Sequence, residues 1–255
     1  MLQTRVIPVL LLQNKGLVKT VKFKNSTYIG DPLNAIKIFN EKEVDELIFL
    51  DIDASKEGRS PDFNIIKNFA SECFMPVCYG GGITTIDEIQ KIFALGIEKV
   101  SLNTAILKDK HLIREAVSVF GSQSIVVTVD IKKTLFGKYQ VYNHRNKQMI
   151  KEPYIEYIKN LEKLGVGEIL INNVDLDGTQ QGYDVFLLKE VVNNVKIPVI
   201  ACGGASGLDD FKKVKKQAHV AAVAAGSFFV FQGKHNAVLI TYPKYEVLEK
   251  LFGEE

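Results

Sequence analysis

The sequence is poor in cysteine and has almost no excess of charge of either sign. Its cysteines, Cys73, Cys78 and Cys202, are odd in number and lack CxxC spacing, which argues against a disulfide framework and a zinc motif. Lys and Arg total 32 against 30 for Asp and Glu, and the lysines are scattered. We therefore expect a cytoplasmic protein with reduced thiols, no metal and no nucleic-acid partner. A few local contacts could still hold an anionic small molecule.

Long hydrophobic runs are also missing. The N-terminal stretch MLQTRVIPVLLLQNKG has an apolar run shorter than a membrane span, and no small-residue cleavage site follows it. Neither membrane insertion nor export is therefore predicted. With 46% hydrophobic and 24% charged residues, the chain has an ordinary globular composition, and its 255 residues match the usual length of one eight-fold α/β barrel. We predict a single domain over residues 1–255.

Short apolar runs alternate with amphipathic segments along the whole chain. The predicted strands are RVIPVLL, ELIFLDI, PVCYG, KVSLN, SIVVTVD, EILINNV, PVIAC and VAAVAAG. Between them, apolar residues recur at helical spacing in segments such as 31–43, 63–74, 86–95 and 154–164. Alternating strands and helices predict a parallel sheet, and eight such units without a long linker fit a closed (β/α)8 TIM barrel better than an open doubly wound sheet.

The two halves of the sequence resemble each other. Three segments of the first half align in order with three of the second, and the first pair is 122 positions apart. A nearly constant offset favours an internal half-barrel duplication over chance similarity of buried strands. The aligned pairs are ELIFLDID with EILINNVD, YGGGI with CGGA, and SLNT with AAGS.

Glycine runs follow the third and seventh predicted strands, and a polar strand end follows each run. Glycine there exposes backbone N–H groups, and a nearby hydroxyl or helix start completes an anion pocket. One such run alone is more often a tight turn. Two equivalent runs predict two phosphate pockets on opposite sides of the barrel mouth, which suits a substrate with a phosphate at each end. The predicted phosphate-binding residues are Gly81, Gly82, Asn103 and Thr104 on one side and Gly203, Gly204, Gly226 and Ser227 on the other.

These motifs resemble the cyclase subunit (HisF) of imidazole glycerol phosphate synthase over nearly the entire chain. The matching segments are RVIP, GDP, DELIFLDI, GGGI, KVSLNTA, FGSQSIVV, VDLDGTQQGYD and PVIACGGA. The resemblance implies a TIM barrel that needs no cofactor and forms a heterodimer with a HisH-like glutaminase subunit. In that family, ammonia from the glutaminase passes through the barrel and attacks a phosphorylated ribotide, which is then cyclised and cleaved.

The resemblance also implies an ammonia gate on the N-terminal face of the barrel. Its charged positions correspond here to Arg5, Glu46, Lys99 and Glu168, and all four charges are present. A structural alternative is an ion-pair network that only closes the barrel floor. The two roles are compatible, and a retained gate argues against a barrel that has become only a scaffold.

Family members use two Asp residues, on the first and fifth strands, for acid–base catalysis. Asp130 matches the second and is the predicted catalytic residue, with a helix N-cap as the alternative. Leu11 stands at the first position, and no insertion before Gly30 brings another acid into place. A lone loop lysine is more often solvated, and Asp51, at a strand end, has helix capping or hydrogen bonding as its alternative. The resemblance nevertheless assigns substrate binding to Lys19 on the long first loop and to Asp51, Asp177 and Thr179.

Further departures from the family occur at Phe39, Asn172 and Cys202, where Tyr, Thr and Ser are usual. Together with Leu11, the VKTVKFKN segment and the GSFFVFQGKHNAVLITYP segment, they resemble a divergent branch linked to acetamidino sugars of surface glycans such as lipopolysaccharide. In that branch the pair supplies ammonia to a sugar amidotransferase. The leading prediction is therefore a synthase subunit that uses or relays ammonia. The alternatives are an ordinary cyclase of histidine biosynthesis and a non-catalytic, phosphate-binding partner that activates the glutaminase.

Overall fold

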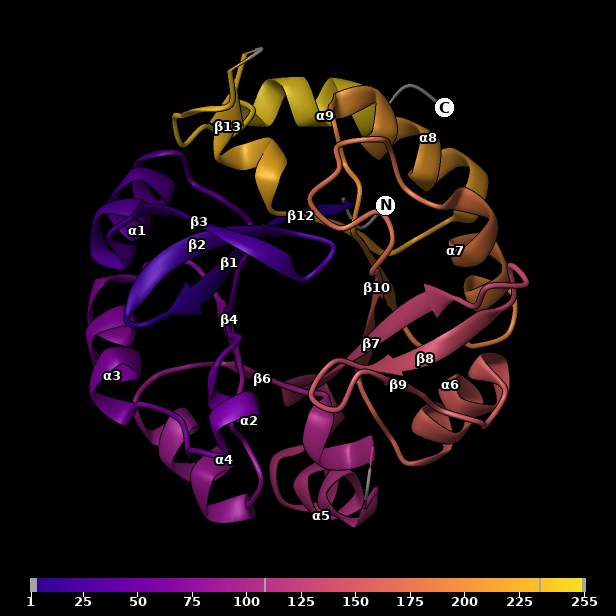
Figure 1. Cartoon of the computed structure of the whole chain (residues 1–255). Helices are drawn as coiled ribbons and strands as arrows, with labels where there is room; N and C mark the ends of the chain where they lie inside the picture. Colours follow the sequence, from indigo (N-terminus) through magenta and orange to yellow (C-terminus); the bar gives the residue numbers. More distant parts are fainter. Residues whose placement is uncertain (1–3, 108, 234, 254–255) are drawn as a thin grey trace.

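The computed structural model describes residues 4–107, 109–233 and 235–253, so both ends of the predicted domain lie outside the described residues. A closed ring of parallel strands stands at the centre, and helices surround it (Figure 1). Strand β12 pairs with β1 in the register Arg5 to Ala222, which closes the ring and confirms the TIM barrel. In ring order the strands are β1 (Arg5–Gln13), β4 (Leu47–Asp51), β5 (Val77–Gly80), β6 (Lys99–Leu102), β7 (Ile125–Lys133), β10 (Glu168–Asn173), β11 (Val199–Cys202) and β12 (Ala222–Ala225).

The helices cover the outside of the barrel with their apolar faces. Helix α1 buries Ala35, Ile36 and Phe39 at helical spacing, and the Asp31 carboxylate caps it by accepting from two backbone N–H groups. The four predicted helical segments all form helices, with ends shifted by one or two residues. The helices are α1 (Pro32–Glu41), α2 (Ala54–Glu57), α3 (Phe63–Glu72), α4 (Ile86–Ala94), α5 (His111–Phe120), α6 (Tyr154–Lys163), α7 (Val185–Val192), α8 (Leu208–Ala218) and α9 (Tyr245–Gly253). In the described part of the chain, no helix is both long and apolar enough to cross a bilayer.

Alternation along the strands separates two hydrophobic clusters. Val6, Leu10 and Leu12 of β1 belong to the cluster between barrel and helices. Ile7 and Val9 belong to the cluster inside the barrel, which also contains Ile48, Cys78, Val126, Leu170, Ile200, Ala222 and Ala224. Leu11, Leu50 and Cys202 pack against this inner cluster. Leu11 therefore points into the barrel at the end of β1.

The region predicted as a long first loop is instead a β-hairpin. Strands β2 (Gly16–Val21) and β3 (Lys24–Gly30) pair antiparallel, and β2 continues the ladder of β1. The two-residue turn of Asn14 and Lys15 has positive φ at both positions, 48° and 66°, which is the type I′ geometry that suits twisted strands. Lys19 thus lies on a strand rather than on a loop.

A second hairpin occupies the equivalent place after the fifth barrel strand. Strand β8 (Tyr139–Asn143) pairs antiparallel with β7, and β9 (Gln148–Met149) pairs with β8. Both barrel strands that carry a hairpin, β1 and β7, are nine residues long. Figure 1 shows the two hairpins in front of the barrel, above its mouth. The matching hairpins agree with a half-barrel duplication.

Candidate active site and charged floor

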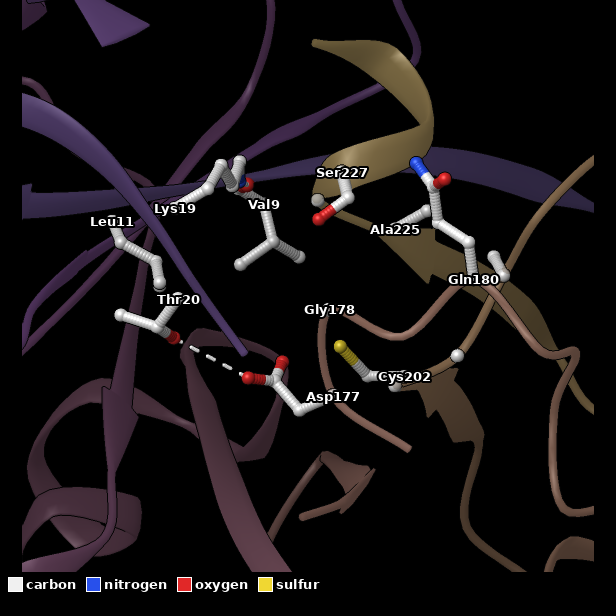
Figure 2. A pocket seen from close by; sticks show the side chains of 14 residues that line it. Val9, Leu11, Lys19, Thr20, Asp177, Gly178, Gln180, Cys202, Ala225 and Ser227 are labelled. Atoms are coloured by element: carbon white, nitrogen blue, oxygen red, sulfur yellow. Dashed lines mark hydrogen bonds between the residues drawn. The ribbon is translucent and has the colours of Figure 1, made fainter. Parts of the chain in front are cut away.

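A pocket opens at the carboxyl ends of β1, β11 and β12, beneath the first hairpin (Figure 2). Val9, Leu11, Ala225 and Cys202 contribute to its lining, and the rest is largely polar. Six predicted site residues come together there: Lys19, Asp177, Gly203, Gly204, Gly226 and Ser227. Ser227 begins a short 3-10 helix, so its backbone N–H lies at a helix start, as an anion pocket requires. Phosphate binding at these residues remains a prediction.

Lys19 and Asp177 both line this pocket, and Lys19 has almost no exposure to water. The Lys19 ammonium donates to the Val9 carbonyl, and the Asp177 carboxylate accepts from the Thr20 hydroxyl at 3.4 Å (Figure 2). Burial lowers the pKa of Lys19 to about 8, against the opposing charge of Asp177. Burial likewise raises the pKa of Asp177 to about 6, against the charge of Lys19. The two groups are therefore charged at the same time only between about pH 6 and pH 8.

The lysine makes stability depend on pH. In the unfolded chain Lys19 keeps its proton up to its ordinary pKa of 10.5, whereas in the folded protein it loses the proton near pH 8. At Lys19 the unfolded chain therefore binds more protons between these values, and this residue raises the free energy of unfolding there by about 3 kcal/mol. The thiols of Cys73 and Cys202, whose pKa burial raises to about 12, act in the opposite direction above pH 9. Urea unfolding of wild type and Lys19→Met from pH 7.5 to 10.5 measures the contribution of Lys19 as a difference between the two proteins that changes with pH by this amount. The control Lys15→Met, at an exposed lysine, follows the wild-type profile; the same profile in wild type and Lys19→Met would contradict the assignment.

Asp130 lies in β7 at the mouth and is almost fully buried. The Asn172 amide donates to one of its oxygens at 3.2 Å, and the Asn103 amide donates to the other at 2.8 Å. His144, in the turn between β8 and β9, places its Nδ1 3.7 Å from the second oxygen. No helix begins at Asp130, which removes the N-cap alternative. Sequence reasoning missed His144 because a single histidine in a polar turn carries no signal of its own.

The predicted residues on the other side of the mouth are engaged with the chain itself. The Asp51 carboxylate accepts from the Arg59 guanidinium at 2.8 and 2.9 Å and from the backbone N–H groups of Asp53 and Ala54. The Asn103 amide is directed to Asp130, so its backbone N–H is the group left to meet a phosphate. Thr104 begins a 3-10 helix, as Ser227 does on the opposite side.

Close backbone contacts explain part of the glycine pattern. A Cβ on Gly81 would lie 2.3 Å from the Asp51 carbonyl oxygen, and one on Gly204 would lie 2.1 Å from the Gly182 carbonyl oxygen. Gly82 and Gly203 have similarly close neighbours. Packing alone therefore requires glycine at these positions, and phosphate binding would be an additional role. Thr179 lies in the same loop as Asp177 and donates its hydroxyl to the Leu176 carbonyl, within its own turn.

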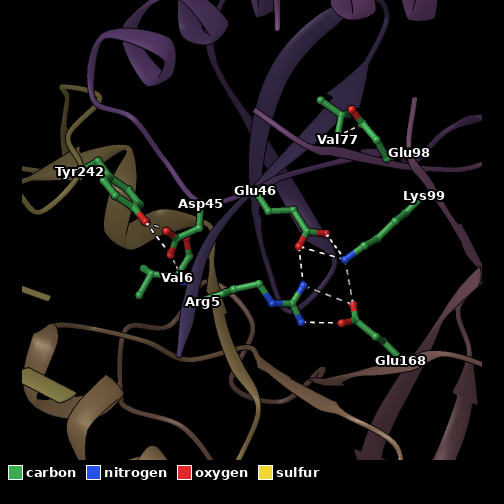
Figure 3. Close-up of polar contacts among 9 residues, drawn as sticks. All are labelled: Arg5, Val6, Asp45, Glu46, Val77, Glu98, Lys99, Glu168 and Tyr242. Atoms are coloured by element: carbon green, nitrogen blue, oxygen red, sulfur yellow. Dashed lines mark hydrogen bonds and ion pairs between the residues drawn. The ribbon is translucent and has the colours of Figure 1, made fainter. Parts of the chain in front are cut away.

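The four predicted gate residues form a closed ring of alternating charge on the N-terminal face (Figure 3). The Arg5 guanidinium lies 2.5 Å from both Glu46 and Glu168. The Lys99 ammonium lies 3.1 Å from Glu46 and 3.2 Å from Glu168. Burial alone would lower the pKa of Arg5, but the charges of Glu168 and Glu46 outweigh it and raise that pKa. The ring spans the floor of the barrel, opposite the pocket.

A metal centre finds no support in the part of the chain that the structure describes, where no group of three or more His, Cys, Asp or Glu side chains is arranged to hold an ion. The chemistry available at the mouth is that of a buried carboxylate with two amide donors, a buried lysine, an imidazole and exposed backbone N–H groups. Such groups bind anions and exchange protons.

Comparisons with known proteins give one consistent result. The sequence model of the family described as "Histidine biosynthesis protein" matches residues 5–236. A protein of Pseudomonas aeruginosa, provisionally named imidazole glycerol phosphate synthase subunit hisF2, is 53% identical over 98% of this chain and 99% of its own length. A Vibrio vulnificus protein, provisionally named subunit hisF3, is 50% identical over 95% and 94% of the two chains. The imidazole glycerol phosphate synthase subunit HisF of Sulfurisphaera tokodaii is 43% identical over 88% and 89%.

Proposed function

Since the chain belongs to the HisF-like cyclase subunits of imidazole glycerol phosphate synthase, we propose that it is the ammonia-handling subunit of a glutamine-dependent amidotransferase that no longer performs the ring closure of histidine biosynthesis. A HisH-like glutaminase releases the ammonia, and the barrel receives it at Arg5, Glu46, Lys99 and Glu168. A sugar amidotransferase takes the ammonia at the barrel mouth and incorporates its nitrogen into an acetamidino sugar of a surface glycan.

Leu11 is the observation that carries this proposal. Its side chain packs with Leu50 and Cys202 on the inner apolar cluster, at the mouth where a carboxylate would have to face the substrate. A leucine can neither donate nor accept a proton. No other acid compensates from the same strand, because β1 is RVIPVLLLQ. Half of the acid–base pair implied by the family is therefore missing.

The complete ring of four charged residues on the barrel floor supports the proposed passage of ammonia. Three of the four charged side chains are more than four-fifths buried, and every one has two ion-pair partners of opposite sign. Buried ion pairs are weak contributors to stability compared with apolar packing, so stability alone is a poor reason to keep four of them. Transit of a small polar molecule through the floor is a better one. The alternative of an ordinary cyclase rests on Asp130.

The proposal predicts a heterodimer through the N-terminal face. We expect the chain and its cognate HisH-like glutaminase to elute together from a sizing column at the mass of a one-to-one complex. The exposed carboxylates of Asp45 and Glu98 lie next to the ring, where they accept from the backbone N–H groups of Val6 and Val77 (Figure 3). The proposal places these carboxylates against basic groups of the glutaminase, so Asp45→Arg together with Glu98→Arg is expected to weaken the complex at least tenfold by charge repulsion. Lys213→Glu, at an exposed residue of helix α8, is the control and leaves assembly unchanged. A complex unaffected by the double variant would place the glutaminase elsewhere.

A further inference from the structure

The Asp130 carboxylate has an unusual set of neighbours for a buried acid. It is 3% exposed, and two amides donate to it, but amides bring no compensating charge. Among the ion pairs of the described residues, its one cationic contact is His144, with Nδ1 3.7 Å from the carboxylate. An ionised carboxylate away from water is costly unless an opposite charge accompanies it. The imidazole is placed to provide that charge when it is protonated.

Two hairpins hold the His144 ring. The residue lies in the β8–β9 turn, and its ring packs edge-on against Phe23, which lies in the β2–β3 turn, with centroids 6.0 Å apart and planes at 82°. The imidazole side chain is 20% exposed. It therefore contacts the buried carboxylate on one side and retains access to the barrel mouth.

We propose that His144 is the proton-exchanging residue of this site and that Asp130 positions it. Asp130 accepts a hydrogen bond from Nδ1–H after a small approach from 3.7 Å, and Nε2 is left free to exchange a proton with the nitrogen that leaves the barrel. Ammonium has no lone pair and cannot attack an electrophile. Its N–H bond breaks, the electron pair stays on nitrogen, and Nε2 carries the proton until water removes it. This assignment rests on the proposed function and gives the site the proton carrier that Leu11 cannot be.

Other charged groups near the imidazole come from three elements. Arg145 and Lys147 are on its own turn, and the Arg145 guanidinium extends toward Gly58 on the opposite side of the mouth. Lys22 and Lys24 flank Phe23 on the facing hairpin, and Asp130 is on β7. Of these groups, Asp130 is the one that can accept a hydrogen bond from the imidazole.

His111 and Glu115 provide an internal control. Their Nδ1–Oε2 distance is also 3.7 Å, but the two side chains are 68% and 49% exposed. Water and salt screen an exposed pair far more than a buried one. The same geometry therefore predicts a large coupling for His144 and a small one for His111.

The test is nitrogen NMR of the histidine rings in the isolated full-length protein. In wild type we expect neutral His144 to carry its proton on Nδ1, which is read without any variant. Asp130→Asn removes the anionic acceptor and is expected to shift the neutral His144 ring toward the Nε2–H form, while Glu115→Gln leaves the tautomer of the exposed His111 unchanged. A neutral Nε2–H form in wild type, or a His144 tautomer that Asp130→Asn leaves unchanged, overturns the pairing. These readings require no partner, so they fail independently of the proposed function.

The exchange itself is measured in the complete complex with the glutaminase and the sugar amidotransferase. His144→Gln is expected to lower glutamine-dependent product formation about 100-fold and to flatten its dependence on pH between 6 and 8. Glutamine hydrolysis stays unchanged, which separates this loss from failed assembly. Product formation that keeps the wild-type pH profile in His144→Gln contradicts the role of His144.

Discussion

Glu46→Gln is expected to lower the free energy of unfolding by about 3 kcal/mol. The Glu46 side chain is 3% exposed and pairs with both Arg5 and Lys99. Replacement by the neutral amide leaves two partly buried cations to share Glu168, and breaking a pair that is shielded from water is costly. Urea unfolding at pH 7 measures the change as a lower midpoint with the same slope.

The matched control for this prediction is Glu57→Gln. Glu57 pairs with Arg59 at 2.7 Å, nearly the distance of Glu46 to Arg5, but its side chain is 54% exposed. Exposed pairs contribute about 0.5 kcal/mol. If Glu46→Gln lowers the free energy of unfolding no more than Glu57→Gln does, the ring carries little interaction energy. The charged floor would then need another explanation.

The barrel could be predicted from the sequence because its strands and helices have clear periods. Alternation and apolar runs located all eight barrel strands, and the ends of the four predicted helices were within two residues, as for Pro32–Glu41 against the predicted 31–43. Asp31 and Pro32 explain that accuracy, since a cap followed by proline marks a helix start strongly. The strand ends, in contrast, gave no sign of the hairpins.

The first hairpin was missed because its turns lack the usual glycine. Both turns, Asn14-Lys15 and Lys22-Phe23, have positive φ at two non-glycine residues. Sequence rules associate that geometry with Asn-Gly or Asp-Gly, and only Asn14 gives a partial signal. The strain at Phe23 is compensated by tertiary contacts: the Lys22 N–H donates to the Asp177 carbonyl at 2.9 Å, and the Phe23 ring packs on His144. Such contacts cannot be read from a local pattern.

For the site, the positions of the residues could be predicted from the sequence, but their contacts could not. The four floor residues meet in one ring, and Lys19 and Asp177 line one pocket, because strand register fixes which residues meet at each barrel end. The partners of the predicted residues were not foreseen. Arg59 on Asp51, Asn172 on Asp130 and His144 on Asp130 join segments far apart in the chain. Only the folded arrangement reveals these contacts.

The second large effect concerns Leu11 and ring closure. General acid–base catalysis by one positioned group contributes about 100- to 10,000-fold to a rate. The family resemblance implies two such carboxylates, and this chain offers Asp130 on β7 against Leu11 on β1. We therefore expect cyclisation of the histidine-pathway ribotide at least about 100-fold slower than in a HisF subunit that has both acids. Binding of the phosphorylated ribotide is expected to suffer less, because the glycine-rich strand ends are retained.

The most direct measurement supplies the purified protein with that ribotide and a saturating ammonium salt, so that no glutaminase is needed, and follows formation of the imidazole product. The HisF subunit of Sulfurisphaera tokodaii, 43% identical to this chain, serves as the parallel positive control. The account predicts a rate below about one hundredth of the control, with Leu11 as the cause. Turnover at the rate of the control would contradict it and would identify the chain as an ordinary cyclase.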